Sequence, residues 1–338
     1  MILTSRIVEQ VVDRAERDTF VKEVIVTRGD TPLAMVRKRL AANGGGSHAP
    51  VLLIHGFGEN RYAWHLPSRS FANYLARQGF DVFNLDLRGH GRSRHFGGKH
   101  CTSVADYWEE DIPNAVDEVL HISGQPKTWL VGHSLGGLVS YAAAPGLDGA
   151  VAGIASVGSP YHFARGSISL SAVATMVRAL TLLQLRPNPS MVLKPVGFTL
   201  SSIRRFAESP LYPIPWRGWH KGALEPHVLA EHLKLAFDRA GLAELIDMFE
   251  WASQKKFGGR ESDASERFEA LKLPLLVIAG TSDDLAPPDS VRPAFTRSRS
   301  PDKTYRALPL GHIDLLVGRD APRTMWPMLS DWLLARAA

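Results

Sequence analysis

The sequence predicts an α/β protein whose mostly parallel sheet is covered by helices on both faces. Short apolar runs with strong β-propensity recur along the chain with helix-length segments between them, and this alternation is typical of parallel strands. The chain has 338 residues, of which 45% are hydrophobic and 22% charged, as in an ordinary globular protein with a sizeable core. No internal repeat or low-complexity segment interrupts the pattern.

The elements follow in a regular order. The polar N-terminal segment is predicted to be a helix, and residues 21–26 and 33–39, on either side of a turn at Gly29, are predicted to form an antiparallel hairpin. Further strands are expected at residues 51–54, 80–85, 128–131, 153–157, 275–279 and 304–308.

The regular spacing of strands fails once, between Pro160 and about Leu271. Six prolines fall within residues 187–215, and helical segments follow around residues 225–240 and 242–256. We expect a helical cap inserted over the sheet. The predicted organisation is therefore a first core part at 1–159, a cap or lid at 160–271, and a second core part at 272–338.

Composition and charge narrow the class of protein. The net charge is +5, but basic groups are scattered among acidic ones, so we expect a solvated surface and no nucleic-acid partner. Cys101 is the single cysteine, which excludes an internal disulfide framework. Residues 168–185 are the most apolar stretch, but Arg178 and several hydroxyls interrupt it, so no stable membrane insertion is expected.

The remaining expectations concern location and cofactors. The N-terminus soon becomes charged and lacks the apolar core of a signal peptide, so a cytoplasmic protein is expected. His95, His100 and Cys101 lack an obvious fourth ligand, so we predict no metal site and no cofactor. The sequence leaves the oligomeric state open.

The segment Gly132-His133-Ser134-Leu135-Gly136 carries the main chemical signal. It stands between the apolar run 128–131 and a helix-compatible run that begins at Leu135. A serine on a sharp strand-to-helix turn exposes its hydroxyl, and small residues two before and two after let the backbone pack closely. Ser134 is therefore the predicted nucleophile.

A serine hydroxyl is a weak nucleophile and needs a histidine base, which a carboxylate orients. His312 follows the last predicted strand, where a loop at the carboxyl end of a parallel strand would face the nucleophile. The segment 280–287 follows the preceding strand and offers Asp283 and Asp284; the spacing favours Asp283, and Asp284 is interpreted as a turn or cap residue. Three other histidines beside glycine-rich turns are expected to pack or brace the site: His55, His90 and His133.

Acyl chemistry also requires hydrogen-bond donors for the developing oxyanion. The backbone N–H groups of Leu135, the residue after the nucleophile, and of Phe57, in the glycine loop 55–58, are the candidates. Trp216 and Trp219 belong to an aromatic and proline-rich segment that either forms the cap core or lines the acyl site. His133, Trp216 and Trp219 are the candidate substrate contacts.

Five segments together resemble the ordered motif set of the α/β-hydrolase superfamily, over about residues 50–160 and 270–335. They are His55-Gly56-Phe57-Gly58, the loop from Asp86 to Ser93, Gly132-His133-Ser134-Leu135-Gly136-Gly137, the segment 280–287, and Gly311-His312. The resemblance implies an eight-stranded, mostly parallel sheet with a cap after the sixth strand. It also implies a triad of Ser134, Asp283 and His312, with oxyanion donors at Phe57 and Leu135.

Within the superfamily the chain resembles serine esterases and lipases. The segment 311–316, followed by Asp320-Ala321-Pro322, is similar to the C-terminal part of acid lipases and of polyester-synthase relatives, although the synthases usually place cysteine where Ser134 stands. The predicted reaction is hydrolysis of a small-molecule carboxylic ester, with a hydrophobic or lipid-like acyl group, through an acyl-enzyme on Ser134.

Other functions remain open on the same residues. Acyl transfer and hydrolysis of thioesters, amides or C–C bonds can use the same triad. A serine at position 134 argues against epoxide hydrolases and dehalogenases, which need a carboxylate nucleophile. A non-catalytic binding protein on this fold would be marked by a missing triad member, and none is missing.

Overall fold

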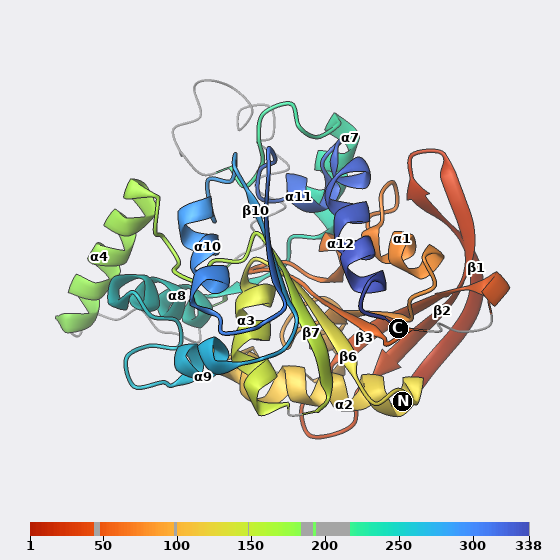
Figure 1. Ribbon diagram of the computed structural model, residues 1–338, viewed down its shortest axis with the longest axis horizontal. Helices are drawn as coiled ribbons and strands as arrows, with labels where there is room; N and C mark the ends of the chain where they lie inside the picture. The colour runs from red at the N-terminus through yellow and green to blue at the C-terminus, as the bar shows by residue number, and fades with distance from the viewer. Residues whose placement is uncertain (44–47, 98–99, 148, 184–191, 194–216, 338) are drawn as a thin grey trace.

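The structure is a computed structural model, and it describes residues 1–43, 48–97, 100–147, 149–183, 192–193 and 217–337. Within these ranges nine strands form one sheet in the order β1-β2-β3-β5-β4-β6-β7-β10-β11 (Figure 1). The strands are β1 (Ile2–Asp13), β2 (Glu16–Val26), β3 (Ala34–Leu40), β4 (Val51–Ile54), β5 (Val82–Asp86), β6 (Thr128–His133), β7 (Val151–Val157), β10 (Leu275–Gly280) and β11 (Lys303–Leu308).

The strand directions confirm the predicted class. β1, β2 and β3 are antiparallel, β3 pairs antiparallel with β5, and the strands from β5 to β11 in the sheet order are parallel to one another. The predicted hairpin exists as β2 and β3, and the six later strands lie within two residues of their predicted ends. The carboxyl ends of the parallel strands therefore meet at one edge of the sheet.

The predicted N-terminal helix is wrong, because residues 2–13 form strand β1. This strand pairs with β2 from Ile2↔Ile25 to Asp13↔Glu16 and adds a ninth strand to the predicted eight. The segment is rich in isoleucine, valine and threonine, which favour extended backbone, so β-propensity was the better guide than polarity.

Helices cover both faces of the sheet, and alternate strand residues supply the two cores. Leu52 and Ile54 of β4 belong to one apolar cluster, and Val51 and Leu53 belong to the other. Helices α2 (Ile112–Ser123), α3 (Leu135–Ala143) and α10 (Pro288–Arg297) cover the first face, and α1 (Phe71–Arg77), α11 (Asp314–Val317) and α12 (Met325–Leu334) the second (Figure 1).

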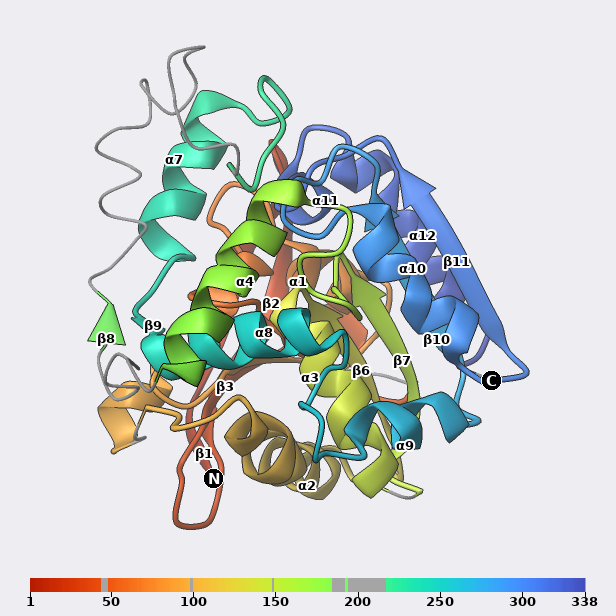
Figure 2. The same ribbon diagram turned by 90° about the vertical axis from the view of Figure 1, so that its left-hand side faces the viewer.

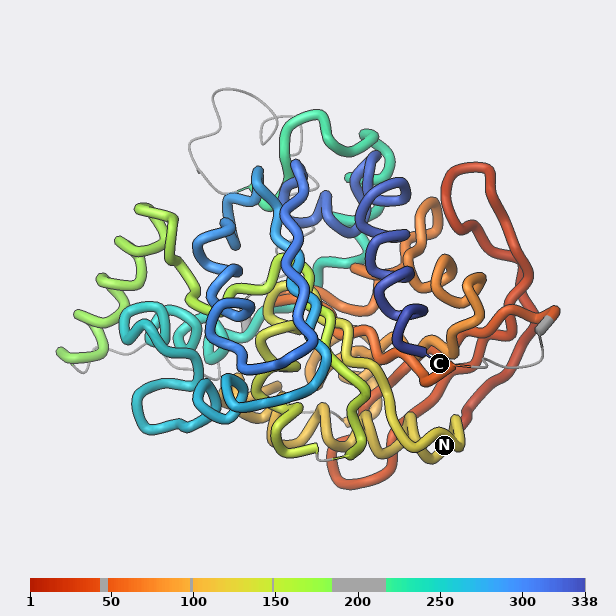
Figure 3. The backbone as a smooth tube through the Cα atoms, in the orientation of Figure 1, coloured from red at the N-terminus to blue at the C-terminus, as the bar shows by residue number. Residues whose placement is uncertain are grey.

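The C-terminal helix packs beside a helix from the first part of the core on the second face. The backbone trace shows the C-terminal helix α12 running beside α1 (Figure 3). The rings of Phe71 and Trp326 lie 5.7 Å apart between the two helices. Packing between segments so distant in sequence ties the C-terminal helix to the first part of the core.

The segment between β7 and β10 contains several helices. Its described elements are α4 (Ile168–Leu182), β8 (Val192–Leu193), α7 (Pro226–Leu235), β9 (Ala240–Gly241), α8 (Leu242–Gln254) and α9 (Ala264–Ala270). α9 packs on α3, with the rings of Tyr141 and Phe268 only 4.4 Å apart, so the end of the insertion belongs to the core on the sheet. The predicted proline cluster lies almost entirely outside the described residues.

Helix α4 packs against α8 and exposes much of its apolar surface. It crosses α8 (Figure 2) and buries Leu170 and Ala174 against Phe249. Ile168 is 93% exposed and Leu182 is 73% exposed, so much of the apolar surface of α4 faces outward. No helix in the described ranges is both long and apolar enough to cross a bilayer.

Candidate active site

Ser134 sits on a strained turn between β6 and α3. Its backbone has φ +52° and ψ −122°, a region that non-glycine residues rarely adopt. A Cβ at Gly132 would lie 2.3 Å from the Gly137 nitrogen, and one at Gly136 would lie 2.4 Å from the Ile54 oxygen. The close packing predicted from the small residues is therefore present, and Ser134 is partly exposed at the carboxyl edge of the sheet.

Asp283 and His312 form a hydrogen-bonded pair in the loops after β10 and β11. Nδ1 of His312 donates to Oδ2 of Asp283 at 2.7 Å, and both residues are buried. The other carboxylate oxygen of Asp283 accepts the N–H groups of Leu285 at 2.9 Å and Ala286 at 2.7 Å. The carboxylate is held from both sides, and Nε2 of His312 is left as the nitrogen that can accept a proton.

The electrostatics of the pair favour a basic histidine. Burial by itself would lower the pKa of His312, but the charge of Asp283 and its hydrogen bond more than offset burial. The pKa of His312 is therefore raised above its ordinary value. A raised pKa makes the imidazole a stronger proton acceptor.

Asp284 has a different environment from its neighbour. Its Oδ2 accepts the N–H of Arg217 at 2.8 Å, and its Oδ1 accepts the N–H of Gly218 at 3.2 Å. Burial raises the pKa of this carboxyl despite these two donors. Asp284 thus holds the backbone at residues 217–218, whereas Asp283 accepts the hydrogen bond from His312.

Backbone contacts bring Ser134 next to the Asp283–His312 pair. The N–H of Ser134 donates to the Val157 carbonyl at 3.0 Å, and Gly158 follows at once with φ +55°. A Cβ at Gly158 would lie 3.3 Å from both Oδ2 of Asp283 and Nδ1 of His312. The hydroxyl of Ser134 makes no hydrogen bond with any residue that the structure describes.

The two predicted oxyanion donors flank the serine. Leu135 is the first residue of α3, a position whose N–H has no partner inside the helix. Phe57 follows Gly56, where an added Cβ would lie only 3.0 Å from Cβ of Ser134. The loop after β4 therefore runs directly against the predicted nucleophile.

Glu59 is a buried charge beside the site that the sequence analysis missed. Its Oε2 accepts the N–H of Gly56 at 3.0 Å and lies 3.3 Å from Nδ1 of His133; its Oε1 lies 3.3 Å from Nε2 of His232 in α7. Burial would raise the pKa of Glu59, but the hydrogen bond from His133 and the nearby imidazole of His232 hold this pKa well below its ordinary value. The sequence does contain a signal for Glu59, because it is an acidic residue directly after an apolar and glycine-rich segment.

The three candidate substrate contacts differ in their surroundings. His133 is 1% exposed, with its ring nitrogens facing Glu59 and the backbone oxygen of His312, so it packs inside the protein and has no surface for a substrate. Trp219 is 4% exposed and belongs to the core cluster that includes Leu224 and Val228, so it is part of the packed interior. Trp216 lies outside the described residues.

The loops predicted to brace the site do so. The N–H of Leu87 donates to Nε2 of His55 at 3.1 Å, and Nδ1 of His55 donates to the Gly56 carbonyl at 2.9 Å. Burial lowers the pKa of His55 to about 4, so its ring is neutral at neutral pH. Asp86 accepts the N–H groups of Arg61 at 2.8 Å and Arg92 at 2.9 Å. These bonds join the loops after β4 and β5.

Comparison with known proteins places this fold and site in a class. A family model of the alpha/beta hydrolase fold matches residues 49–319, and the chain belongs to this family, as its motifs predicted. Its solved structural neighbours, all less than 25% identical, share this fold and include esterases and lipases.

Three individual relatives share less than a third of their aligned residues with this chain. The poly(3-hydroxyalkanoate) polymerase subunit PhaC of Haloferax mediterranei is 26% identical over 300 residues, which cover 85% of this chain and 59% of that protein. The chain thus spans less than two thirds of that relative. The monoacylglycerol lipase of Paleococcus ferrophilus is 21% identical, with 90% of this chain and 99% of that one covered and a TM-score of 0.59. A soluble variant of the monoglyceride lipase of Saccharomyces cerevisiae is 17% identical, with coverage of 94% and 96% and a TM-score of 0.61.

Proposed function

We propose that this protein is a serine hydrolase that cleaves a carboxylic ester through an acyl-enzyme on Ser134. The observation that carries the proposal is the 2.7 Å hydrogen bond between His312 and Asp283 beside a serine held at φ +52°. Strain of this kind is kept where the surrounding structure imposes it, and it clusters at functional sites.

The proposed reaction assigns one task to each group. Oγ of Ser134 attacks the ester carbonyl while Nε2 of His312 takes its proton, and Asp283 holds the opposite side of the ring. The N–H groups of Phe57 and Leu135 donate to the oxyanion, each contributing about 3 kcal/mol when well placed. His312 then protonates the leaving alcohol, activates water for attack on the acyl-enzyme, and the acid is released.

A hydrophobic acyl group is the proposed substrate feature. It is supported by the likeness to lipases and to a poly(3-hydroxyalkanoate) polymerase subunit. If an apolar pocket binds the acyl chain, each buried methylene should contribute about 0.8 kcal/mol until the pocket is full. The p-nitrophenyl esters of acetate, butyrate, octanoate and dodecanoate measure this as a rise and then a plateau in kcat/KM.

Acyl transfer is the second candidate function. It is favoured by the similarity to the polymerase subunit, which extends over 85% of this chain. In transfer, a hydroxyl of an acceptor molecule would replace water in the second step. Adding a hydroxyacid ester as acceptor and measuring the ratio of transfer product to free acid separates the two functions.

The nucleophile is tested with a fluorophosphonate probe and a substrate panel of esters, thioesters and amides. Ser134→Ala should lose both labelling and turnover. Ser140→Ala is a matched control in the same helix, because its hydroxyl only donates to the Gly136 carbonyl. Labelling that persists in Ser134→Ala would overturn the assignment, and turnover confined to thioesters or amides would replace the ester in the proposal.

A further inference from the structure

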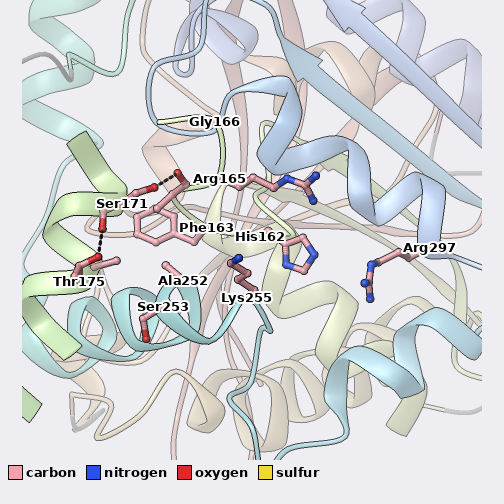
Figure 4. A pocket seen from close by; sticks show the side chains of 12 residues that line it. His162, Phe163, Arg165, Gly166, Ser171, Thr175, Ala252, Ser253, Lys255 and Arg297 are labelled. Atoms are coloured by element: carbon pink, nitrogen blue, oxygen red, sulfur yellow. Dashed lines mark hydrogen bonds between the residues drawn. The ribbon is translucent and has the colours of Figure 1, made fainter. Parts of the chain in front are cut away.

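A pocket lies apart from the proposed catalytic residues. It is lined by the loop after β7, helix α4, the end of α8 and the end of α10 (Figure 4), and its volume is about 630 Å³. Ser134, Asp283 and His312 do not line it. The volume is within the range of pockets that bind small organic molecules.

Positive charge is concentrated around this pocket. Arg165, Lys255 and Arg297 line it, and its lining residues include no carboxylate. Arg297 is paired with Glu269 at 2.8 Å, whereas Arg165 and Lys255 make no ion pair with any residue in the described ranges. The pocket therefore carries uncompensated positive charge, which attracts anions.

His162 also lines this pocket, and it adds no positive charge there. Burial, followed by the charges of Arg297 and Arg165, lowers the pKa of His162 to about 4, so the ring is neutral at neutral pH. The positive charge of the lining therefore comes from the lysine and the two arginines.

The opposite lining is apolar. Phe163, Ala164, Ala174 and Ala252 contribute it, and the Phe163 ring is fixed by an edge contact with Phe249 at 5.2 Å between centroids. Figure 4 shows Phe163 and Ala252 beside the cationic side chains. A charged rim joined to an apolar wall suits a ligand with one charged end and one apolar end.

The backbone of Lys255 is unusual for a lysine. It caps the C-terminus of α8 in the left-handed conformation with φ +56°, where glycine is the ordinary residue. A glycine would remove the strain and would also remove the ammonium group from the pocket. This position therefore permits the charge to be deleted without disturbing the helix end.

We propose that this pocket binds an amphiphilic anion, with a carboxylate or phosphate head beside Arg165, Lys255 and Arg297 and a medium-length apolar chain against Phe163 and Ala252. Guanidinium groups match the geometry of both anions. The site is separate from the proposed reaction at Ser134, and the inference stands if that reaction is a different one.

Calorimetric titration of the full chain with decanoate, decyl phosphate, decanol and inorganic phosphate, all below micelle formation, tests the proposal. The two amphiphilic anions should bind, whereas decanol and inorganic phosphate should bind at least about tenfold more weakly, because each lacks one of the two contacts. The preferred anion identifies the head group. Equal binding of decanol, or no binding of either anion, would overturn the proposal.

Substitutions in the pocket test where the ligand binds. Arg165→Gln combined with Lys255→Gly should weaken binding at least about tenfold, and Thr175→Trp should block it by filling the pocket. Lys127→Gln, which removes an exposed charge outside the pocket, should stay within about twofold. Thermal unfolding verifies that each variant is folded. Unchanged affinity in both pocket variants would assign the ligand to another site and refute the inference.

Discussion

Replacing Glu59 with alanine should damage the oxyanion loop while leaving the fold largely intact. The change removes the acceptor for the N–H of Gly56 at 3.0 Å and the partner of His133 and His232, each at 3.3 Å. An unpaired buried donor costs about 1–3 kcal/mol, and the longer hydrogen bond from His133 belongs at the low end, so the loss should be about 3 kcal/mol. Most domains have about 5–15 kcal/mol to lose, so the variant should still fold at room temperature.

The effect on catalysis should exceed that of simple destabilisation. Phe57 lies between Gly56, whose N–H Glu59 holds, and Gly58, whose carbonyl accepts the N–H of Asp238 at 2.7 Å. Releasing one end of this segment should misplace one oxyanion donor, which costs about a hundredfold in kcat with little change in KM. Glu59→Gln keeps an acceptor for Gly56 but loses the charge, so about a tenfold fall is expected.

Urea unfolding and steady-state ester hydrolysis measure the two effects separately. Glu231→Gln is the control, because Glu231 also anchors α7, through the N–H and hydroxyl of Ser68 at 3.1 and 2.6 Å, but does not touch the oxyanion loop. It should lower stability and leave kcat unchanged. If Glu59→Ala keeps wild-type kcat, or if Glu231→Gln lowers kcat equally, the positioning role is refuted.

Three further predictions concern the carboxylates and the histidine. Asp283→Asn should lower kcat by about four orders of magnitude and Asp284→Asn far less; if steady-state kinetics show the larger fall in kcat for Asp284→Asn, this assignment is contradicted. Because the pKa of His312 is raised, kcat/KM should rise with pH through an apparent pKa above about 6.5, and the stabilisation from this group, complete below about 6.5, should be lost as pH rises through the folded pKa. An activity pKa below 6 would exclude His312 as the base. Burial raises the pKa of Asp314 to about 7, so stability should fall as pH rises from about 4 to 7, and Asp314→Asn should flatten that fall in urea titrations. An unchanged slope would show that Asp314 does not titrate there.

Residues in short motifs were predictable. Ser134 needs only a strand, a turn and a helix in sequence order, and glycines at positions 132 and 136 supply the close approach. Asp283 and His312 were found because parallel strands bring their carboxyl ends to one edge, where the two side chains meet at 2.7 Å. The choice between Asp283 and Asp284 followed from spacing, and each carboxylate has its own partners in the structure.

Residues whose environment depends on segments far away in the chain were not predictable in the same way. His133 was assigned a tentative substrate contact, yet it is buried against Glu59 and His312. Trp219 is core, and α4 exposes apolar side chains that an amphipathic pattern would have buried. The environment of each of these residues depends on contacts with segments far away in the chain, and local sequence does not encode those contacts.

The sequence by itself determined the α/β class, the order of the parallel strands along the chain and the residue types at the proposed site, because these depend on local backbone preference and on periodic burial. Only the tertiary structure showed that β1 extends the sheet, that Glu59 joins the loop after β4 to His232 of α7, and that Arg165 and Lys255 line a common pocket. These features are contacts between segments far apart in the chain, and their free energy depends on the packing of the whole fold rather than on neighbouring residues.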